Sequence, residues 1–257
     1  MNSIQSLAGK KGLIVGIAND NSIAYGCATV LKRLGAELAV TYLNEKAERF
    51  VRPLAEALEC PIILQMDVEK PDELERVFAA IEETWGTLDF VIHSIAFCPT
   101  QDLHGRVTDC LKEGFLQAMG VSCYSLIEMA RLAEPLMKDG GAIVTMSYYG
   151  AGKVVENYNV MGPVKAALES TVRYLAAELG QQRIRVHAVS PGPLKTRAAS
   201  GIAHFDQLLE EAIARTPEHR LVDIEDVGMT TAFLVSDAAR AMTGEVIHVD
   251  GGFHMMA

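Results

Sequence analysis

Short apolar runs alternate along the whole chain with longer stretches that have helical periodicity. Each short run is bounded by glycine or by a polar turn, which is typical of a strand buried in a parallel sheet. The strands expected on this basis are 11–17, 37–42, 62–66, 88–95, 142–146, 184–189 and 245–249.

The longer stretches repeat apolar residues at the spacing of an amphipathic helix, as Ile23, Cys27, Val30 and Leu34 do in the first of them. The expected helices are 22–37, 45–58, 71–85, 106–138, 157–179 and 224–236, and the stretch 198–215 becomes helical toward its end. This alternation predicts a single α/β domain spanning 1–257, with a Rossmann-like, doubly wound, seven-stranded parallel sheet covered by helices on both faces.

Ligands of such sheets bind beyond the carboxyl ends of the strands. In this chain those ends are 16–19, 43–45, 67–68, 94–97, 147–150 and 191–196. The first of them contains Gly16, and the next glycine is Gly26, so the G-x-G-x-x-G dinucleotide fingerprint is not met. Gly16 could still let a phosphate approach the backbone, and Ser22 and Ile23 would offer free N–H groups at a helix start. By itself this pattern leaves nucleotide binding and an ordinary tight turn both open.

The second strand ends in Leu43-Asn44-Glu45, where a bound dinucleotide would present its adenosine ribose. NADP calls for Arg or Lys at that place, whereas Lys46 already lies one position into the helix, so the sequence favours NADH over NADPH. Asp67, at the end of the third strand, could accept a hydrogen bond from adenine or could serve as an ordinary turn residue.

Tyr148, Tyr158 and Lys165 follow the fifth expected strand. If the helix begins near 157, Tyr158 and Lys165 share one helix face and lie about 10 Å apart along the axis. A tyrosine hydroxyl beside an ammonium can stabilise or protonate an oxyanion. The alternative is that Tyr158 packs in the core and Lys165 is solvated.

Composition narrows the class of protein. The chain has 257 residues, of which 49% are hydrophobic and 22% charged, and no apolar run approaches the 18 residues of a membrane span, so we expect a soluble, cytoplasmic protein. The net charge of −10 argues against nucleic-acid binding. The 5 cysteines show no C-x-x-C spacing and the 7 histidines no H-E-x-x-H pattern, so neither disulfides nor a metal is expected.

Several motifs together resemble one family. They are Gly16-Ile-Ala-Asn, Ser22-Ile-Ala-Tyr-Gly26, His93-Ser-Ile-Ala-Phe97, Tyr158-Asn-Val-Met-Gly-Pro-Val-Lys165 and Gly244-Glu-Val-Ile-His-Val-Asp-Gly-Gly252. The chain resembles the enoyl-acyl-carrier-protein reductases of bacterial type II fatty acid synthesis, a divergent branch of the short-chain dehydrogenase/reductases. Ordinary members of that superfamily place lysine four residues after the catalytic tyrosine, whereas here that position is Gly162 and the lysine follows at 165.

The resemblance implies hydride transfer from NADH to a trans-2-enoyl thioester carried by acyl carrier protein or CoA. Its catalytic residues would be Tyr158, which bonds the thioester carbonyl, Lys165, which holds the nicotinamide ribose, and Tyr148, which borders the acyl chain. The implied cofactor residues are Gly16, Ser22, Ile23, Asp67, Val68, Ile95, Lys165, Leu194 and Thr196. The implied substrate residues are Ala96, Phe97, Tyr148, Tyr158, Met161, Ile202 and Phe205, four of which (Phe97, Met161, Ile202 and Phe205) could equally be core residues.

The chain also departs from the family pattern. Leu43, Ala96 and Pro191 stand where glutamine, glycine and a small residue are common in the family. The expected substrate lid, 195–215, carries no lysine or arginine between 203 and 211, which leaves Lys195, Arg197 and Arg215 to meet an acidic carrier protein. The family also implies a homotetramer. Two alternatives stay open: a carbonyl or alcohol dehydrogenase of the same superfamily, and a protein that binds NAD(H) without catalysis.

Overall fold

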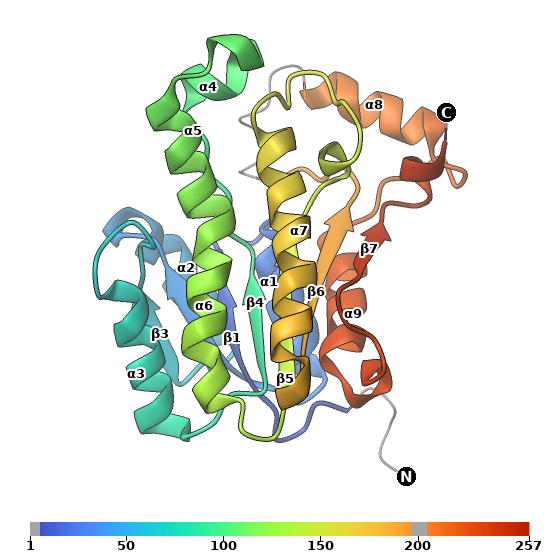
Figure 1. Cartoon of the computed structure of the whole chain (residues 1–257). Helices are drawn as coiled ribbons and strands as arrows, with labels where there is room; N and C mark the ends of the chain where they lie inside the picture. Colours follow the sequence, from blue (N-terminus) through green and yellow to red (C-terminus); the bar gives the residue numbers. More distant parts are fainter. Residues whose placement is uncertain (1–5, 197–204, 257) are drawn as a thin grey trace.

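A seven-stranded parallel sheet forms the middle layer of the molecule (Figure 1). The computed structural model describes residues 6–196 and 205–256. The strand order is β3-β2-β1-β4-β5-β6-β7, so the chain reverses its direction of winding between β1 and β4. The strands are β1 Lys11–Val15, β2 Glu37–Tyr42, β3 Ile62–Gln65, β4 Phe90–His93, β5 Gly141–Met146, β6 Ile184–Pro191 and β7 Val246–Val249. The predicted doubly wound fold is confirmed.

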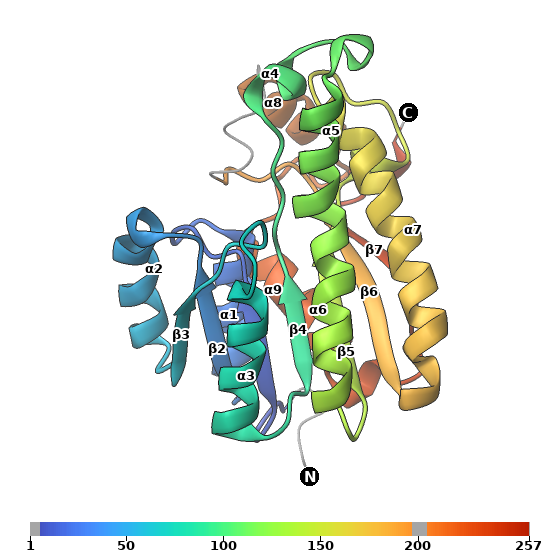
Figure 2. The ribbon, with the colours of Figure 1, turned by 60° about the vertical axis from the view of Figure 1, so that its left-hand side comes forward.

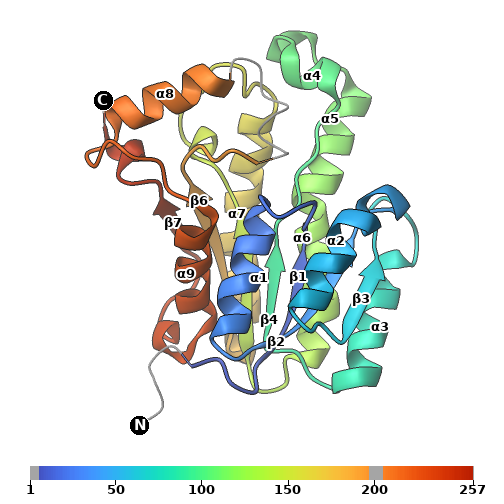
Figure 3. The same ribbon diagram turned by 180° about the vertical axis from the view of Figure 1, so that it is seen from behind.

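Helices cover both faces of the sheet, and each face has its own core. Along β1 the side chain of Ile14 points into one core, while its neighbours Leu13 and Val15 point into the other. The first core is covered by α1 Ile23–Arg33, α2 Glu45–Ala57 and α9 Ile224–Val235, seen from behind in Figure 3. The second is covered by α3 Glu73–Trp85, α6 Ser125–Ala133 and α7 Met161–Leu179. Because buried strands face two cores, their sequences are apolar throughout.

The expected helix 106–138 is wrong as a single element. A short helix α4, Thr100–His104, and a 3₁₀ turn, Val107–Asp109, precede α5, Lys112–Met119. A π-helical segment, Gly120–Tyr124, then joins α5 to α6, so that the two helices form one column in Figure 2. A further 3₁₀ turn, Glu134–Leu136, follows α6. The periodicity of the sequence is nearly the same through all these segments, which is why the breaks were missed.

The expected start of the next helix near 157 is also wrong, because α7 begins at Met161. Asn157 and Asn159 have positive φ values of 61° and 42°, which a right-handed helix does not accommodate. Tyr158 therefore lies in the turn before the helix, and the predicted shared helix face of Tyr158 and Lys165 does not exist.

Helices α1 and α9 touch through their backbones. A Cβ atom added to Gly26 would lie 2.3 Å from the carbonyl oxygen of Ile224, and one added to Gly228 would lie 2.6 Å from that of Gly26. Gly26 thus serves helix packing rather than phosphate binding. Both helices lie on the face seen in Figure 3.

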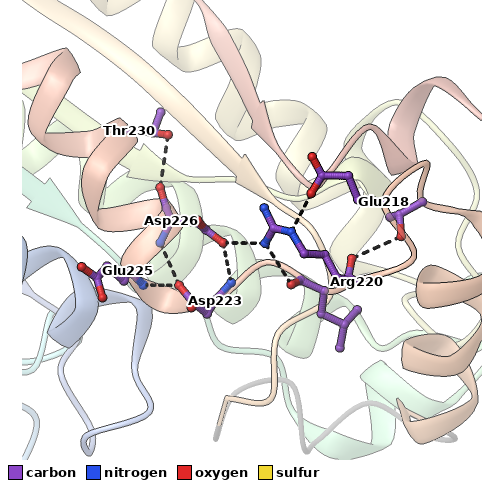
Figure 4. A network of polar contacts seen from close by, with 8 residues as sticks. Glu218, Arg220, Asp223, Glu225, Asp226 and Thr230 are labelled. Atoms are coloured by element: carbon purple, nitrogen blue, oxygen red, sulfur yellow. Dashed lines mark hydrogen bonds and ion pairs between the residues drawn. The ribbon is translucent and has the colours of Figure 1, made fainter.

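A polar network holds the connection between α8, Phe205–Arg215, and α9 (Figure 4). Arg220 pairs with Glu218 at 2.6 Å and with Asp226 at 3.3 Å. Asp223 caps α9 by accepting the N–H groups of Glu225 and Asp226. The arginine side chain is 55% exposed, so each pair adds little stability, but together they fix the path of the chain behind α8.

Within the described residues, none of the helices combines the length and the apolar character that crossing a membrane requires.

Candidate active site

The glycine turn after β1 is fixed by packing and by one serine. Gly16 has φ of 108°, and a Cβ atom there would lie 2.0 Å from the carbonyl oxygen of Ser94, at the end of β4. The Ser22 hydroxyl accepts the N–H groups of Ala18 and Asn19, each at 3.0 Å. The turn is therefore closed by its own residues, at the point where β1 and β4 diverge and where doubly wound sheets bind their ligands. Helix α1 begins directly behind it, at Ile23.

The other predicted cofactor residues follow neighbouring strands at this same edge. Asp67 and Val68 come after β3, Ile95 after β4, and Leu194 and Thr196 after β6. Asp67 has the turn role that the sequence left open, since its Oδ1 accepts the N–H of Glu69 at 3.1 Å. Ile95 packs partly buried against one core, whereas Leu194 is buried in the other.

The end of β2 carries two different roles. Asn44 is the N-cap of α2 and accepts the N–H of Ala47 at 3.1 Å. Leu43 leaves the sheet with 53% of its surface exposed. No basic side chain stands between the strand and this cap, which matches the sequence argument for NADH.

Two tyrosine rings pack edge to face at the end of β5. The rings of Tyr148 and Tyr158 lie 4.8 Å apart, edge to face. A Cβ atom on Gly150 would lie 2.6 Å from the Tyr158 ring, so the glycine makes room for it. Met161 joins the same apolar cluster, together with Val164 and Ala118. Tyr148 and Tyr158 are thus brought together as predicted, although Tyr158 is not on a helix.

Both phenols are held as proton donors. Burial raises the pKa of Tyr158 and of Tyr148 well above the usual range. The Tyr148 hydroxyl is buried and has no hydrogen-bond partner among the described residues. A buried hydroxyl left unpaired costs free energy until something accepts its proton. This hydroxyl is therefore set to bond a ligand.

Lys165 is buried, not solvated, and so the alternative reading of this residue is wrong. Its exposed fraction is 5%, and its Nζ donates to the carbonyl oxygen of Met146 at 2.7 Å. Burial lowers the pKa of Lys165 to about 8, against the opposing effects of Cys123 and Glu169. A buried ammonium at the carboxyl edge of the sheet can polarise the hydroxyls of a bound ligand.

The predicted substrate residues lie in three different settings. Met161 is buried beside the tyrosines, whereas Ala96 is exposed and Phe97 is 45% exposed at the end of β4. Ile202 lies outside the described residues, and Phe205 is described only as the first residue of α8. Among the cationic residues expected to meet a carrier protein, Lys195 is exposed, while Arg197 also lies outside the described residues. Arg215 is engaged elsewhere, since it donates to the carbonyl oxygen of Met256 and stacks 4.6 Å from Phe253.

Sequence reasoning missed Ser122, which lies in the π-helical segment. Its hydroxyl accepts the N–H of Phe97 at 2.9 Å and donates to the Phe97 carbonyl oxygen at 3.1 Å. Ser122 is fully buried. One side chain thus fixes the backbone that presents Ala96 and Phe97. A serine inside a helical pattern gives no signal of this role.

Sequence reasoning also missed the contacts of three histidines, His93, His248 and His254. His93 is fully buried between Thr145 and Ser125, with both ring nitrogens at 2.8 Å from a hydroxyl, and burial lowers its pKa to about 3. His248 and His254 stack next to Asp250, with possible metal-binding atoms within 4.8 Å of one another. The Asp250 carboxylate already accepts two backbone N–H groups, so its contacts are those of a turn.

Comparison with known proteins decides the family. The family model described as enoyl-(acyl carrier protein) reductase matches residues 16–254. The chain belongs to this family. A curated relative from Rickettsia felis, enoyl-[acyl-carrier-protein] reductase [NADH] FabI, is 47% identical over 250 residues, which cover 97% of this chain and 96% of the relative. The resemblance inferred from the motifs is confirmed.

Solved structures of the family agree with the fold. The crystal structure of the NADH enoyl-[acyl-carrier-protein] reductase from Aquifex aeolicus matches with a TM-score of 0.94 and 49% identity, covering 98% of this chain and 99% of that one. The reductase from Anaplasma phagocytophilum, solved in complex with NAD, matches with a TM-score of 0.93 and 46% identity, covering 99% and 97%.

Proposed function

We propose that this member of the family reduces the trans-2 double bond of an enoyl thioester in fatty acid biosynthesis, with NADH as the reductant. The observation that carries the proposal is the edge-to-face pair of Tyr148 and Tyr158, followed along the chain by the buried Lys165, with the Tyr148 phenol lacking an acceptor among the described residues. Relatives at 47% and 49% identity are named as NADH-dependent enoyl-[acyl-carrier-protein] reductases.

The chemistry needs a site that stabilises an oxyanion. Bound NADH would supply the hydride that adds to the β-carbon of the thioester, which moves the electrons of the double bond onto the carbonyl oxygen. Tyr158 donates a hydrogen bond to that oxygen as negative charge develops, and its raised pKa keeps the proton in place. A proton then reaches the α-carbon and completes the saturated thioester.

Lys165 and Tyr148 orient the reactants. Lys165 donates one hydrogen bond to the Met146 carbonyl oxygen and would use its remaining N–H groups to hold the ribose hydroxyls of the cofactor. A bound ligand would supply an acceptor for the Tyr148 hydroxyl, which has none among the described residues. The remaining cofactor residues are those of the strand ends, Gly16, Ser22, Ile23, Asp67, Val68, Ile95, Leu194 and Thr196. Ala96, Phe97 and Met161 border the acyl chain.

The position four residues after Tyr158 argues against a carbonyl or alcohol dehydrogenase. Those enzymes need lysine there, whereas this chain has Gly162. A Cβ atom at Gly162 would lie 3.2 Å from the carbonyl oxygen of Gly150, which is tight for any side chain. The glycine lets the Tyr148 loop pack against α7, and the lysine stands further along the helix.

The segment 195–215 serves as the substrate lid in this proposal, and its part 197–204 lies outside the described residues. Helix α8 lies beyond the carboxyl edge of the sheet, on the side of β6 and β7 (Figure 1), and the network of Figure 4 anchors the chain that follows it. Helix α8 carries the acidic residues Asp206, Glu210 and Glu211 and a single cationic residue, Arg215. An acidic carrier protein would find little to bind there, so we expect carrier and CoA thioesters to be used with similar efficiency.

We also propose a cytoplasmic homotetramer. Tyr124, on the π-helical segment, is 55% exposed, and Tyr174, on α7, is 74% exposed. A shallow groove lies between α6 and α7. Its apolar lining is Ile127, Ala167, Tyr174 and Leu175, and the polar residues Ser170, Thr171 and Glu178 complete it. A second copy of the chain would cover this apolar face. Light scattering of the purified protein measures the number of subunits.

The deciding experiment is the oxidation of NADH driven by crotonyl thioesters of CoA and of acyl carrier protein, with NADPH as the comparison. We expect turnover with NADH, and a loss of kcat on the order of 100-fold in Tyr158→Phe. Tyr174→Phe, which removes the same hydroxyl from an exposed ring, is the control and should stay near wild type. Absence of turnover with every enoyl thioester, while NADH still binds, would instead favour a protein that binds the cofactor without catalysis.

A further inference from the structure

Two side chains of α7 form hydrogen bonds with consecutive residues at the end of β5. Lys165 and Glu169 stand one helical turn apart and therefore point from the same side of the helix. Lys165 donates to the carbonyl oxygen of Met146 at 2.7 Å. Glu169 Oε1 accepts the hydroxyl proton of Ser147 at 2.6 Å. The next residue is Tyr148.

Ser147 is fixed from two directions. Its backbone N–H donates to the carbonyl oxygen of Val189 on β6 at 2.7 Å, which holds it in line with the sheet. Its side chain bonds to Glu169, and it is 5% exposed. A hydrogen bond from a hydroxyl to a carboxylate is among the stronger ones in proteins, because the acceptor is charged. The backbone that leads into Tyr148 is thereby tied to the helix that carries Lys165.

Glu169 also lies where several groups of the site meet. Its charge raises the pKa of Lys165 on its own helix and of Tyr158 in the preceding turn, and it acts on His248 from β7. Other titratable groups near Lys165, among the described residues, are Cys123 of the π-helical segment and His93 of β4, and burial lowers the pKa of His93 to about 3. Among the described residues, Glu169 is the carboxylate whose charge is felt by Lys165.

We propose that Glu169 is a positioning residue for the reduction: its carboxylate fixes Ser147 and the backbone of Tyr148, and it supplies the negative charge that accompanies the Lys165 ammonium. The inference rests on the proposed function for its catalytic part. Its electrostatic part concerns the binding of NADH and can be measured without turnover.

The two parts are separated by different substitutions. Glu169→Gln keeps an oxygen for Ser147 but removes the charge. Ser147→Ala removes the hydrogen bond and keeps the charge. Glu169→Asp keeps the charge on a shorter side chain, and it also serves if the glutamine variant does not fold. Glu83→Gln removes the same charge from an exposed position on α3 and is the control.

The first measurement is the dissociation constant of NADH against pH, for each variant whose circular dichroism is native. The pKa of Lys165 is about 8 in the free protein, so the ammonium is present below that pH and is lost as the pH rises through it. NADH binding should weaken over the same range. In Glu169→Gln this weakening should begin roughly one pH unit lower, because a nearby carboxylate commonly moves a pKa by about that much. Glu169→Asp, Ser147→Ala and Glu83→Gln should follow the wild-type curve.

The second measurement is kcat with a crotonyl thioester. Ser147→Ala and Glu169→Asp should each lower kcat roughly tenfold, which is the effect of losing one hydrogen bond to a charged group. The proposal is overturned if Glu169→Gln shifts the binding curve no more than Glu83→Gln does, or if Ser147→Ala keeps full turnover. A wild-type protein that binds NADH but reduces no thioester would refute the proposed function, while the pH curves would still test the charge of Glu169.

Discussion

The glycine turn and the tyrosine edge of the site are built in different ways. In the glycine turn, Ser22 bonds residues only three and four positions away, so a short piece of chain closes on itself. In the tyrosine edge, Lys165 and Glu169 reach back 19 and 22 positions, and the Tyr148 hydroxyl has no partner in the part of the chain that the structure describes. One half of the site is complete without a ligand, and the other half is completed by one.

The largest effect is expected in the glycine turn, the half of the site that is complete without a ligand. Gly16→Ala would place a Cβ atom 2.0 Å from the Ser94 carbonyl oxygen, at φ of 108°, and would force the ends of β1 and β4 apart. We expect NADH affinity to fall by about 100-fold, since strain and overpacking together cost roughly 3 kcal/mol. Titration with NADH measures this.

Gly9→Ala is the matched control. Gly9 also has positive φ, but a Cβ atom there would meet nothing within 4 Å. This variant should lose some stability to backbone strain and keep its affinity for NADH. Equal losses of affinity in both variants would show that the contact with Ser94 does not matter.

A smaller effect is expected where a long-range contact shapes the substrate side. Ser122→Ala removes both hydrogen bonds to the Phe97 backbone, 25 positions away. We expect kcat/KM for the thioester to fall by roughly tenfold, the equivalent of about 1.4 kcal/mol, with the NADH dissociation constant unchanged. Steady-state kinetics with separate variation of the two substrates distinguishes these. A change in the NADH dissociation constant alone, with kcat/KM for the thioester unaltered, would contradict the assignment of Ser122 to the substrate side.

The smallest effect concerns stability alone. Tyr148→Phe removes a buried hydroxyl that has no partner among the described residues. The free energy of unfolding of the ligand-free protein should therefore stay the same or rise by up to about 1 kcal/mol. Ser22→Ala, in the closed half, removes an acceptor of two N–H groups and should destabilise by about 1–2 kcal/mol. Urea unfolding of both variants tests the contrast, and a clear loss of stability in Tyr148→Phe would contradict it.

The same contrast explains what could be predicted from the sequence. The strands were found close to their observed places because a strand buried on two faces must be apolar. The glycine turn was found because the hydrogen bonds that close it are local, whereas the packing of Gly16 against Ser94 could not be foreseen. The grouping of Tyr148, Tyr158 and Lys165 came from motif spacing. Their geometry did not, because the positive φ values of Asn157 and Asn159 leave no mark in the periodicity.

The contacts that were missed have no local signature. Ser122 is one serine in a helical pattern, and its role depends on the extra residue of a π-helical turn that aims it at Phe97. The bond between Ser147 and Glu169 joins two segments that only the folded sheet brings together. A glutamate on an amphipathic helix is ordinarily a solvated residue, and nothing in the spacing sets this one apart.

The contact between Gly26 and Gly228 bears on the order of synthesis. The helix that backs the glycine turn rests against α9, and the two glycines bring the backbones of the two helices into direct contact. A ribosome releases the first of these helices some 200 residues before the second. Until the ribosome has released α9, the part of the nascent chain that carries α1 lacks its neighbour, and a chain cut short before Gly228 would expose that surface to chaperones and proteases.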